Sequence, residues 1–260
     1  MRIATWNVNG IRPRLDHIRR FLSEWHVDVL CMQEIKIADD IFPHDSFETM
    51  GYSYRANVGQ KAYHGVAIIS KMPFDNSFRE IFAARDDKRH VAVAFGSFEL
   101  HCFYIPSGGH KPDRAINEKF DHKLRFYEEA KCWFESKRKS TDKLLLVGDF
   151  NVAPKERDVW NHKKLIRSVG HTPQEVEHFT RFQKSLNFED LPRRGLSDSE
   201  NLYTWWGYRY PQSVEKDYGW RLDHAWASPA LAGSVKNCYV VKDTRLWDKP
   251  SDHIPVIIEL

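Results

Sequence analysis

The chain has 260 residues, of which 42% are hydrophobic and 13% aromatic, so it has enough apolar material for a folded core and does not have the composition of a disordered protein. Its 39 lysine and arginine residues against 36 acidic residues leave a net charge of +3, a balance that does not mark the chain as a general nucleic-acid binder. No apolar run approaches the roughly 18 residues that a membrane-spanning helix requires, so we expect no contact with a membrane.

The cysteines and the first residues bear on where the protein works. Without any C-x-x-C spacing, the cysteines do not form a thiol zinc or redox motif, and free thiols fit a reducing compartment. The first residues lack the pattern of an export signal, so we expect a cytoplasmic protein. No linker tract or repeat divides the chain, and we therefore expect residues 1–260 to form a single domain.

The hydrophobic pattern predicts strands in clusters with a few helices between them. Strands are expected at 2–7 and 28–32, with a helix opened by Pro13 between them. The later elements are strands at 64–70, 90–95, 98–105 and 144–147, helices over about 114–137 and from the Thr172–Glu175 capping box, and strands at 221–227, 235–241 and 254–259. This order favours an α/β sandwich, in which two packed sheets have helices outside.

Polar residues recur at the ends of these strands. Taken singly, each would be a turn former or a helix cap. An unpaired charge is costly inside a sheet, however, and a set that recurs at strand ends lies on the rim of the sheets, where sites are commonly built. The set is Asn7, Glu34, Asp149, Asn151, Asp223, Asp252 and His253.

The residue types in this set indicate metal-assisted hydrolysis. Carboxylate and amide oxygens without cysteine suit Mg²⁺ or Mn²⁺ rather than Zn²⁺. His253 adds an imidazole that Asp223 could orient. Hydrolysis of a phosphodiester needs a metal on the phosphate oxygens, an activated water and donors for the developing charge. No Walker A, G-x-G-x-x-G or G-x-S-x-G motif is present, which argues against NTPase, dinucleotide-dependent and α/β-hydrolase functions.

Short motifs along the whole chain resemble one known family. They are Trp6–Arg12, Gln33–Lys36, Tyr104–Gly108, Gly148–Pro154, Thr204–Trp206, Trp220–Asp223 and Ser251–Val256. Each is weak alone, but their occurrence in this order is very improbable by chance. On these residues the chain resembles the exonuclease III family of apurinic/apyrimidinic (AP) endonucleases, within the endonuclease/exonuclease/phosphatase superfamily. The resemblance implies a four-layer α/β sandwich, two facing mixed β-sheets flanked by helices, with the active site at one end.

The resemblance implies a metal site that holds Mg²⁺, with Mn²⁺ as a possible substitute. Glu34 resembles the family's principal metal ligand, Asn7 stands beside it, and Asp252 would be a further carboxylate on the metal side. The full metal-side set is expected to be Asn7, Glu34, Asp149, Asn151, Asp252 and His253.

Catalytic roles follow from the same resemblance. Asp149 resembles the carboxylate that activates the attacking water or protonates the leaving oxygen, and Asn151 the amide that positions the nucleophile. Tyr104 resembles the phenol that hydrogen-bonds the phosphate, and His253 the imidazole that contacts it, oriented by Asp223. Two general bases stay open: Asp149, which is our first choice, and a His253–Asp223 dyad.

The expected substrate is double-stranded DNA with abasic sites or blocked 3′ ends. In the family, an aromatic residue of the Thr-Trp-Trp segment lines a pocket for a sugar that lacks its base. Trp206 is the first candidate for that wall, Trp205 the second, and Trp220 a third that could equally be core. Arg89 is a candidate for holding a backbone phosphate.

The resemblance thus implies a Mg²⁺-dependent DNA repair nuclease that cuts 5′ to abasic sites and has 3′-to-5′ exonuclease and 3′-end-cleaning activity. We expect the protein to act as a monomer. The alternatives are another metal-dependent phosphodiesterase or phosphatase of the superfamily, which would leave the Tyr104 and Thr204–Trp206 motifs unexplained, and a non-catalytic binding relative. Two departures from the family stand out. Ser107 replaces the usual Asn or Gln, which concerns the DNA contact and the balance of endonuclease and exonuclease activity, and Gly207 replaces a common Asp.

Overall fold

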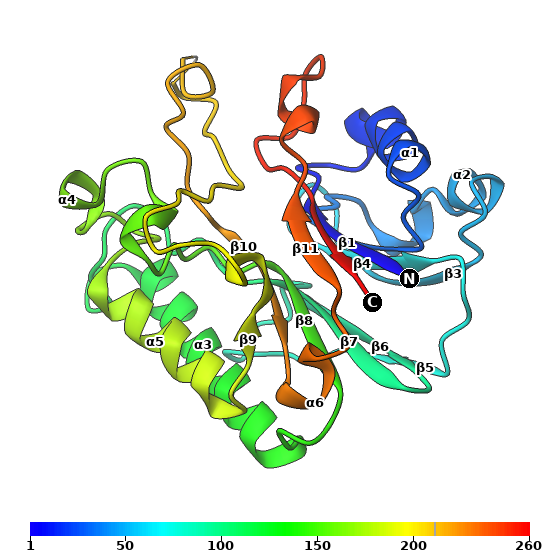
Figure 1. Ribbon diagram of the computed structural model, residues 1–260, viewed down its shortest axis with the longest axis horizontal. Coiled ribbons are helices and arrows are strands. Elements are labelled where there is room, and N and C mark those ends of the chain that lie inside the picture. The colour runs from blue at the N-terminus through cyan, green and yellow to red at the C-terminus, as the bar shows by residue number, and fades with distance from the viewer. Residues whose placement is uncertain (211) are drawn as a thin grey trace.

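The computed structural model describes residues 1–210 and 212–260, and its centre consists of two mixed sheets that face each other (Figure 1). The first sheet has the order β11 (Asn237–Val240), β12 (Val256–Glu259), β1 (Arg2–Asn7), β2 (Val29–Gln33), β4 (Val66–Ser70) and β3 (Tyr54–Val58). The second has the order β5 (Asn76–Phe78), β6 (His90–Phe95), β7 (Phe98–Tyr104), β8 (Leu144–Asp149), β10 (Asp223–Ala227) and β9 (Glu189–Asp190). Strands β1 and β2 are parallel, as are β7 and β8, and the other pairs are antiparallel.

Helices cover the outer faces of both sheets and complete four layers (Figure 1). The helices are α1 (Leu15–Glu24) and α2 (His44–Thr49) on the first sheet, α3 (Glu118–Lys137) and α5 (Pro173–Ser185) on the second, and the short α4 (His162–Leu165) and α6 (Pro229–Ala232). Single 3-10 turns lie at Arg12–Arg14, Asp39–Ile41, Glu156–Asp158, Leu191–Arg193 and Lys242–Leu246. The predicted four-layer α/β sandwich is therefore confirmed.

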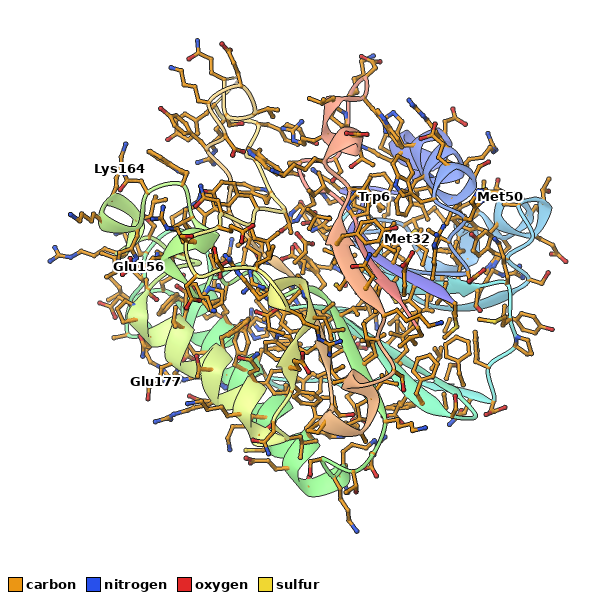
Figure 2. All side chains as sticks on the ribbon, viewed as in Figure 1. Trp6, Met32, Met50, Glu156, Lys164 and Glu177 are labelled. Atoms are coloured by element: carbon orange, nitrogen blue, oxygen red, sulfur yellow. The ribbon has the colours of Figure 1, made fainter. Side chains whose placement is uncertain are left out.

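Strand β8 shows why the inner strands have continuous apolar runs. Leu145 and Val147 point into the core between the two sheets, whereas Leu144 and Leu146 point toward α3 and α5. Both faces of the strand are buried, so both sets of alternating positions must be apolar. The outer core of the first sheet is built in the same way and contains Trp6, which lies in the interior of the molecule in Figure 2.

Two helix starts follow from local capping. The capping box of Thr172 and Glu175 is present, and α5 begins directly after it at Pro173. The helix expected from about 114 begins later, at Glu118, because the Asn117 side chain accepts a hydrogen bond from the Lys119 N–H and caps the helix there. Within the described residues, no helix combines the length and apolar character needed to cross a membrane.

Gly148, the residue before the end of β8, has a φ of +138° and allows β7 and β8 to approach closely. A Cβ at this position would lie 2.0 Å from the carbonyl oxygen of Phe103 on β7. Gly148→Ala should therefore lower the free energy of unfolding by about 2 kcal/mol or more, through backbone strain and overpacking. Urea unfolding measures the change. The matched control is Gly233→Ala, where no atom lies within 4 Å of the added Cβ, and equal stabilities of the two variants would contradict the argument.

Candidate active site

The ends of strands from both sheets bring the predicted polar residues together. In the second sheet, Asp149 pairs in register with Tyr104 on one side and Asp223 on the other. From the first sheet, Asn7 at the end of β1 reaches across the interface. Its Nδ2 donates to Glu34 Oε1 at 3.0 Å and to Asp149 Oδ2 at 2.9 Å. The buried Asn7 side chain therefore joins the two halves of the site.

Glu34, Tyr104 and Asp149 line a cleft of about 670 Å³, whereas Asn7 and Asp223 are buried and do not line it. Its lining includes the loop that follows Tyr104 and the loop of residues 207–210. The segments 212–218 and 242–250 rise from the same edge of the sandwich (Figure 1), and the Tyr208 hydroxyl donates to the Pro250 carbonyl at 2.5 Å. The lining includes Glu34, Tyr104, Ser107, His110, Lys119, Asp149, Asn151, Trp205, Tyr208, Arg209, Trp220, Leu222, Asp252 and His253.

Backbone conformation turns two of the side chains into the cleft. Glu34 directly follows β2 and has a φ of +52°. Asn151 lies two residues beyond the end of β8 and has a φ of +55°. For residues other than glycine this left-handed region costs of order 1–3 kcal/mol, and such strain is concentrated at functional sites. Hydrogen bonds hold the Asn151 turn, because its N–H donates to Asp149 Oδ1 at 2.9 Å and its Nδ2 to the Ile105 carbonyl at 2.9 Å.

Glu34 is an ionised carboxylate at the centre of the site. Lys36 Nζ lies 2.8 Å from its Oε2, and the Tyr104 hydroxyl donates to its Oε1 at 2.9 Å. Burial alone would raise the pKa of Glu34, but Lys36 and the Asn7 amide outweigh it and lower the pKa. Burial and the neighbouring Glu34 raise the pKa of Tyr104, which therefore stays a protonated hydrogen-bond donor.

His253 is held between two buried aspartates. Its Nδ1 lies 2.8 Å from Asp223 Oδ2, and its Nε2 lies 3.8 Å from Asp149 Oδ2. Burial disfavours the imidazolium, but the charges of Asp223 and Asp149 outweigh this effect and raise the pKa of His253. The pKa of Asp149 is also raised, chiefly by burial, with further increases from Asp223 and Glu34. The site thus contains a cationic imidazole beside a carboxyl group that holds its proton more tightly than usual.

A cation fits between three of the predicted ligands. Glu34, Asp149 and His253 each offer one ligand atom, and these atoms lie within 4.8 Å of one another. The two carboxylates, without a thiol, suit a hard divalent cation, whereas the protonated His253 has no free lone pair and borders the ion rather than binding it. Asn7 lies beside Glu34, where its Nδ2 orients both carboxylates and its Oδ1 accepts the Asn9 N–H at 3.0 Å.

Asp252 lines the cleft, but two hydrogen bonds occupy its carboxylate. Its Oδ1 accepts from Asn9 Nδ2 at 2.9 Å, and its Oδ2 accepts from the Trp205 indole Nε1 at 2.9 Å. This role of Asn9 was not predicted from the sequence. The signal was the second asparagine of the Asn-Val-Asn-Gly turn, whose φ of +46° points its side chain toward the site.

Trp206, the first candidate for the pocket wall, does not line the cleft, whereas the other two candidate tryptophans do. Among the described residues, Trp205 and Trp220 line the cleft together with Leu222. Trp206 is only 4% exposed and lies in an apolar cluster with Tyr203 and Ile254. The presence of glycine at position 207 has a steric reason, because a Cβ there would lie 2.8 Å from the Trp205 ring. The glycine lets the Trp205 indole lie across the backbone at the mouth of the cleft.

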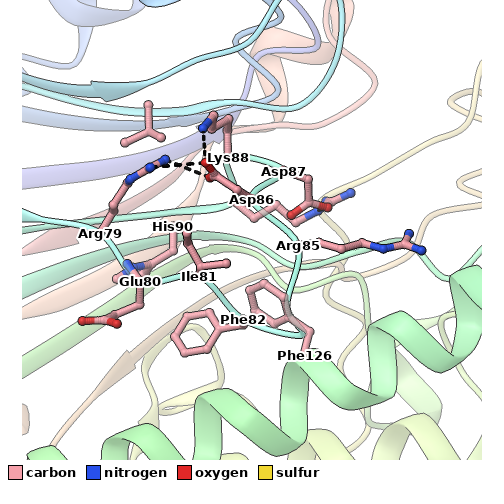
Figure 3. A pocket seen from close by; sticks show the side chains of 12 residues that line it. Arg79, Glu80, Ile81, Phe82, Arg85, Asp86, Asp87, Lys88, His90 and Phe126 are labelled. Carbon is pink, nitrogen blue, oxygen red and sulfur yellow. Dashed lines mark hydrogen bonds and ion pairs between the residues drawn. The ribbon is translucent and has the colours of Figure 1, made fainter.

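Arg89 lies behind the site rather than on its surface. It forms an ion pair with Asp87, donates to the Tyr104 carbonyl at 3.2 Å, and places its guanidinium 4.8 Å from the centre of the Tyr104 ring. The preceding turn is itself fixed by Asp86, on which Arg79 and Lys88 converge (Figure 3). With its charge paired and its side chain buried, Arg89 supports Tyr104 and is not placed to hold a DNA phosphate.

Comparison with known proteins agrees with this geometry. Residues 4–253 match the Endonuclease/Exonuclease/phosphatase family. Exodeoxyribonuclease III of Haemophilus influenzae is 28% identical over 100% of this chain and 99% of its own. The AP endonuclease from Archaeoglobus fulgidus superimposes with a TM-score of 0.92 at 30% identity, over 100% of this chain and 99% of that one. The 3′ phosphatase NExo from Neisseria, bound to a product DNA hairpin, gives a TM-score of 0.91 at 28% identity, over 100% and 99% of the two chains. The chain therefore belongs to the Endonuclease/Exonuclease/phosphatase family, and its full-length relatives include exodeoxyribonuclease III and AP endonucleases.

Proposed function

We propose that this protein is a Mg²⁺-dependent DNA repair nuclease that hydrolyses the phosphodiester 5′ to an abasic site, leaving a 3′-hydroxyl and a 5′-deoxyribose phosphate. The observation that carries the proposal is the convergence of Glu34, Asp149 and His253 in one cleft whose wall contains Trp205 and Trp220. The relatives named as exodeoxyribonuclease III and 3′ phosphatase support additional 3′-to-5′ exonuclease and 3′-end-cleaning activities.

Each polar group in the cleft has a defined part in this reaction. Glu34 and Asp149 would hold a divalent cation, which would supply positive charge to the phosphate oxygens. The cationic His253, held by Asp223 at 2.8 Å, donates from Nε2 toward the phosphate, where charge develops. The Tyr104 hydroxyl, which donates to Glu34 Oε1 at 2.9 Å, becomes a second donor when it turns to the phosphate, and the Asn151 side chain is fixed by the Ile105 carbonyl at 2.9 Å.

Asp149 is the better candidate for the general base. Its raised pKa brings it closer to neutrality than an ordinary aspartate, which suits proton transfer at working pH. The raised pKa of His253 keeps that imidazole protonated, so it is poorly suited to accept a proton from water. Asp223 therefore holds the imidazolium in place.

Trp205 and Trp220 are proposed to form the wall that selects a sugar without a base. A missing base removes stacking, which makes it easier to turn the sugar into an apolar pocket, and the indole rings exclude a normal nucleotide. The Trp205 ring is oriented by the hydrogen bond from its Nε1 to Asp252. The Trp220 ring lies edge-on to it, with the two ring centres 6.3 Å apart.

The two adjacent tryptophans provide a direct comparison. Trp205→Ala should lower the preference for abasic over intact duplex by about 10- to 100-fold while the protein stays folded. Trp206→Ala should instead lower the free energy of unfolding by about 3–5 kcal/mol, because this side chain is core. Incision rates on both duplexes and urea unfolding of both variants separate the outcomes. Loss of selectivity in Trp206→Ala, with stability and selectivity intact in Trp205→Ala, would reverse the assignment.

We also propose that residues 1–260 act as one catalytic domain and as a monomer in the cytoplasm. The site is completed by strands from both ends of the chain, β1 and β12, so the catalytic residues cannot be divided between separate units along the sequence. The free thiols of its four cysteines fit a reducing compartment.

The activity is tested with a duplex that carries one tetrahydrofuran abasic analogue. With Mg²⁺, we expect a single cut on the 5′ side of the analogue and little cutting of the matched intact duplex. Absence of incision, or equal cutting of both duplexes, would reject the abasic specificity. Hydrolysis of bis-p-nitrophenyl phosphate without any DNA cleavage would favour another phosphodiesterase of the same family.

A further inference from the structure

A lysine and a glutamate are completely buried side by side just below the cleft floor. Lys123 of α3 and Glu175 of α5 have side chains with 0% exposure and form an ion pair. A buried ion pair is seldom needed for stability, because apolar residues of similar volume often do as well. The other hydrogen bonds of Lys123 and Glu175 show what this buried pair does.

The ammonium group of Lys123 has three donors, and three acceptors surround it. Besides Glu175, its Nζ donates to the Asn151 carbonyl at 2.7 Å and to the Ser107 carbonyl at 3.3 Å. Its aliphatic stem packs beneath Gly108, where an added Cβ would lie 3.0 Å from the lysine Cδ. Lys123 thus ties the loop after Tyr104 to the loop after Asp149.

Glu175 extends the connection to a third loop of the cleft. Its two carboxylate oxygens accept the Gly170 N–H at 2.9 Å, and Oε2 accepts the Thr172 hydroxyl at 2.6 Å. Gly170 packs against the ring of Trp220, which an added Cβ would approach to 3.3 Å. One ion pair therefore connects the backbone of three loops that line the cleft.

We infer that Lys123, held by Glu175, is a positioning residue that fixes the Asn151 loop in its reactive geometry, an inference that rests on the proposed function. The Asn151 residue has a positive φ, and its carbonyl is fixed by Lys123 while its N–H and side chain reach Asp149 and the Ile105 carbonyl. Without the lysine, the Asn151 carbonyl loses its buried donor and the turn can relax away from Asp149. Lys123 itself acts through Asn151 and touches no reacting atom.

The test is a double-mutant cycle with a paired substitution that leaves no buried charge. The variant Lys123→Met/Glu175→Gln keeps the volume of both side chains, and glutamine preserves the capping box. On the tetrahydrofuran duplex, we expect kcat to fall about 10- to 100-fold, as a misplacement of about 1 Å would cause. In an Asn151→Ala background, the same pair should lower kcat by less than about twofold. The control Lys131→Met, on the partly exposed side of α3, should retain wild-type kcat.

Amide hydrogen exchange gives a readout that needs no substrate. The N–H groups of Asn151 and Ala153 bond to Asp149 Oδ1 at 2.9 Å and to the Gly170 carbonyl at 2.7 Å. Both should exchange faster in the paired variant, while the strand amides of β8 keep their protection. If the wild-type protein did not cut abasic DNA, the proposed function would fail and the exchange result would still decide the positioning role.

Two results would overturn the inference. One is an equal loss of kcat in the wild-type and Asn151→Ala backgrounds, and the other is unchanged exchange of Asn151 and Ala153 in the paired variant. If the paired variant does not fold, Glu175→Gln alone is measured in the same cycle. That variant should show a smaller loss with the same dependence on Asn151, and an additive loss would again reject the role.

Discussion

Asp149→Asn should lower the rate of incision by about 10⁴-fold, the upper end of what a single acid–base group contributes. Asp149 lies at the meeting point of the site, because it accepts from Asn7 at 2.9 Å and from the Asn151 N–H at 2.9 Å and faces His253 at 3.8 Å. The variant should stay folded. Asparagine retains an oxygen that can accept the Asn151 N–H, and burial already favours the uncharged form of residue 149.

The measurement is single-turnover cutting of the tetrahydrofuran duplex, with thermal unfolding of the same samples. Asp198→Asn is the matched control, since that side chain is 96% exposed and contacts Lys155 on the surface. We also expect the Asp149→Asn and His253→Ala losses to be non-additive, because the two groups act as one unit. If Asp149→Asn cuts at the wild-type rate while His253→Ala is inactive, proton transfer belongs to the His253–Asp223 dyad.

Removal of divalent cations should abolish incision. Substitution of Glu34 should weaken the response of the incision rate to Mg²⁺. With EDTA we expect no cutting, and excess Mg²⁺ should restore the wild-type rate. Glu34→Gln should raise the Mg²⁺ concentration for half-maximal activity by about 10- to 100-fold, because it removes a charge from the ligand set. Glu177→Gln, an exposed position on α5 (Figure 2), is the control and should behave as wild type.

Thermal unfolding gives a second readout of the same site. A cation that binds the folded chain at 100 times its dissociation constant adds about 2.7 kcal/mol to the free energy of unfolding. Mn²⁺ or Mg²⁺ should therefore raise the melting temperature of the wild-type protein and have a much smaller effect on Glu34→Gln. An equal shift in both proteins would place the cation elsewhere.

The sandwich could be predicted because its strands have strong local signals. The continuous apolar run at β8 and the capping box at α5 both predict their elements without tertiary information. Strand β5 and helix α2 were not predicted, since they are short and mostly polar, with only Phe47 buried in α2. Such elements form because the neighbouring strand or sheet stabilises them, and this contribution is absent from a local pattern.

The candidate site was predictable in its residue types but not in the directions of its side chains. Trp205 and Trp206 are neighbours on an extended segment whose residue 205 bridges to both Trp220 and His253. Successive side chains of an extended segment point to opposite sides, so one indole enters the cleft and the next enters the core. The sequence does not reveal which of the two tryptophans faces the cleft, because both side chains are identical.

Long-range pairing explains the other differences. Arg89 and Lys123 are basic residues that would be solvated by default, yet one pairs with Asp87 behind Tyr104 and the other with Glu175 below the cleft. The partner of Lys123 lies 52 residues away on another helix. Only the fold determines that these charges are buried, so their supporting roles could not be read from the order of residues.

The most direct test of the account is a crystal structure of the protein with Mn²⁺ and an uncleaved duplex that carries one tetrahydrofuran site, with the cation located by its anomalous signal. We predict a Mn²⁺ peak within coordination distance of Glu34 and the scissile phosphate, His253 Nε2 within hydrogen-bond distance of that phosphate, and the abasic sugar against Trp205 and Trp220. A cation bound away from Glu34 and Asp149, or a sugar that remains in the duplex with the cleft empty, would contradict the account.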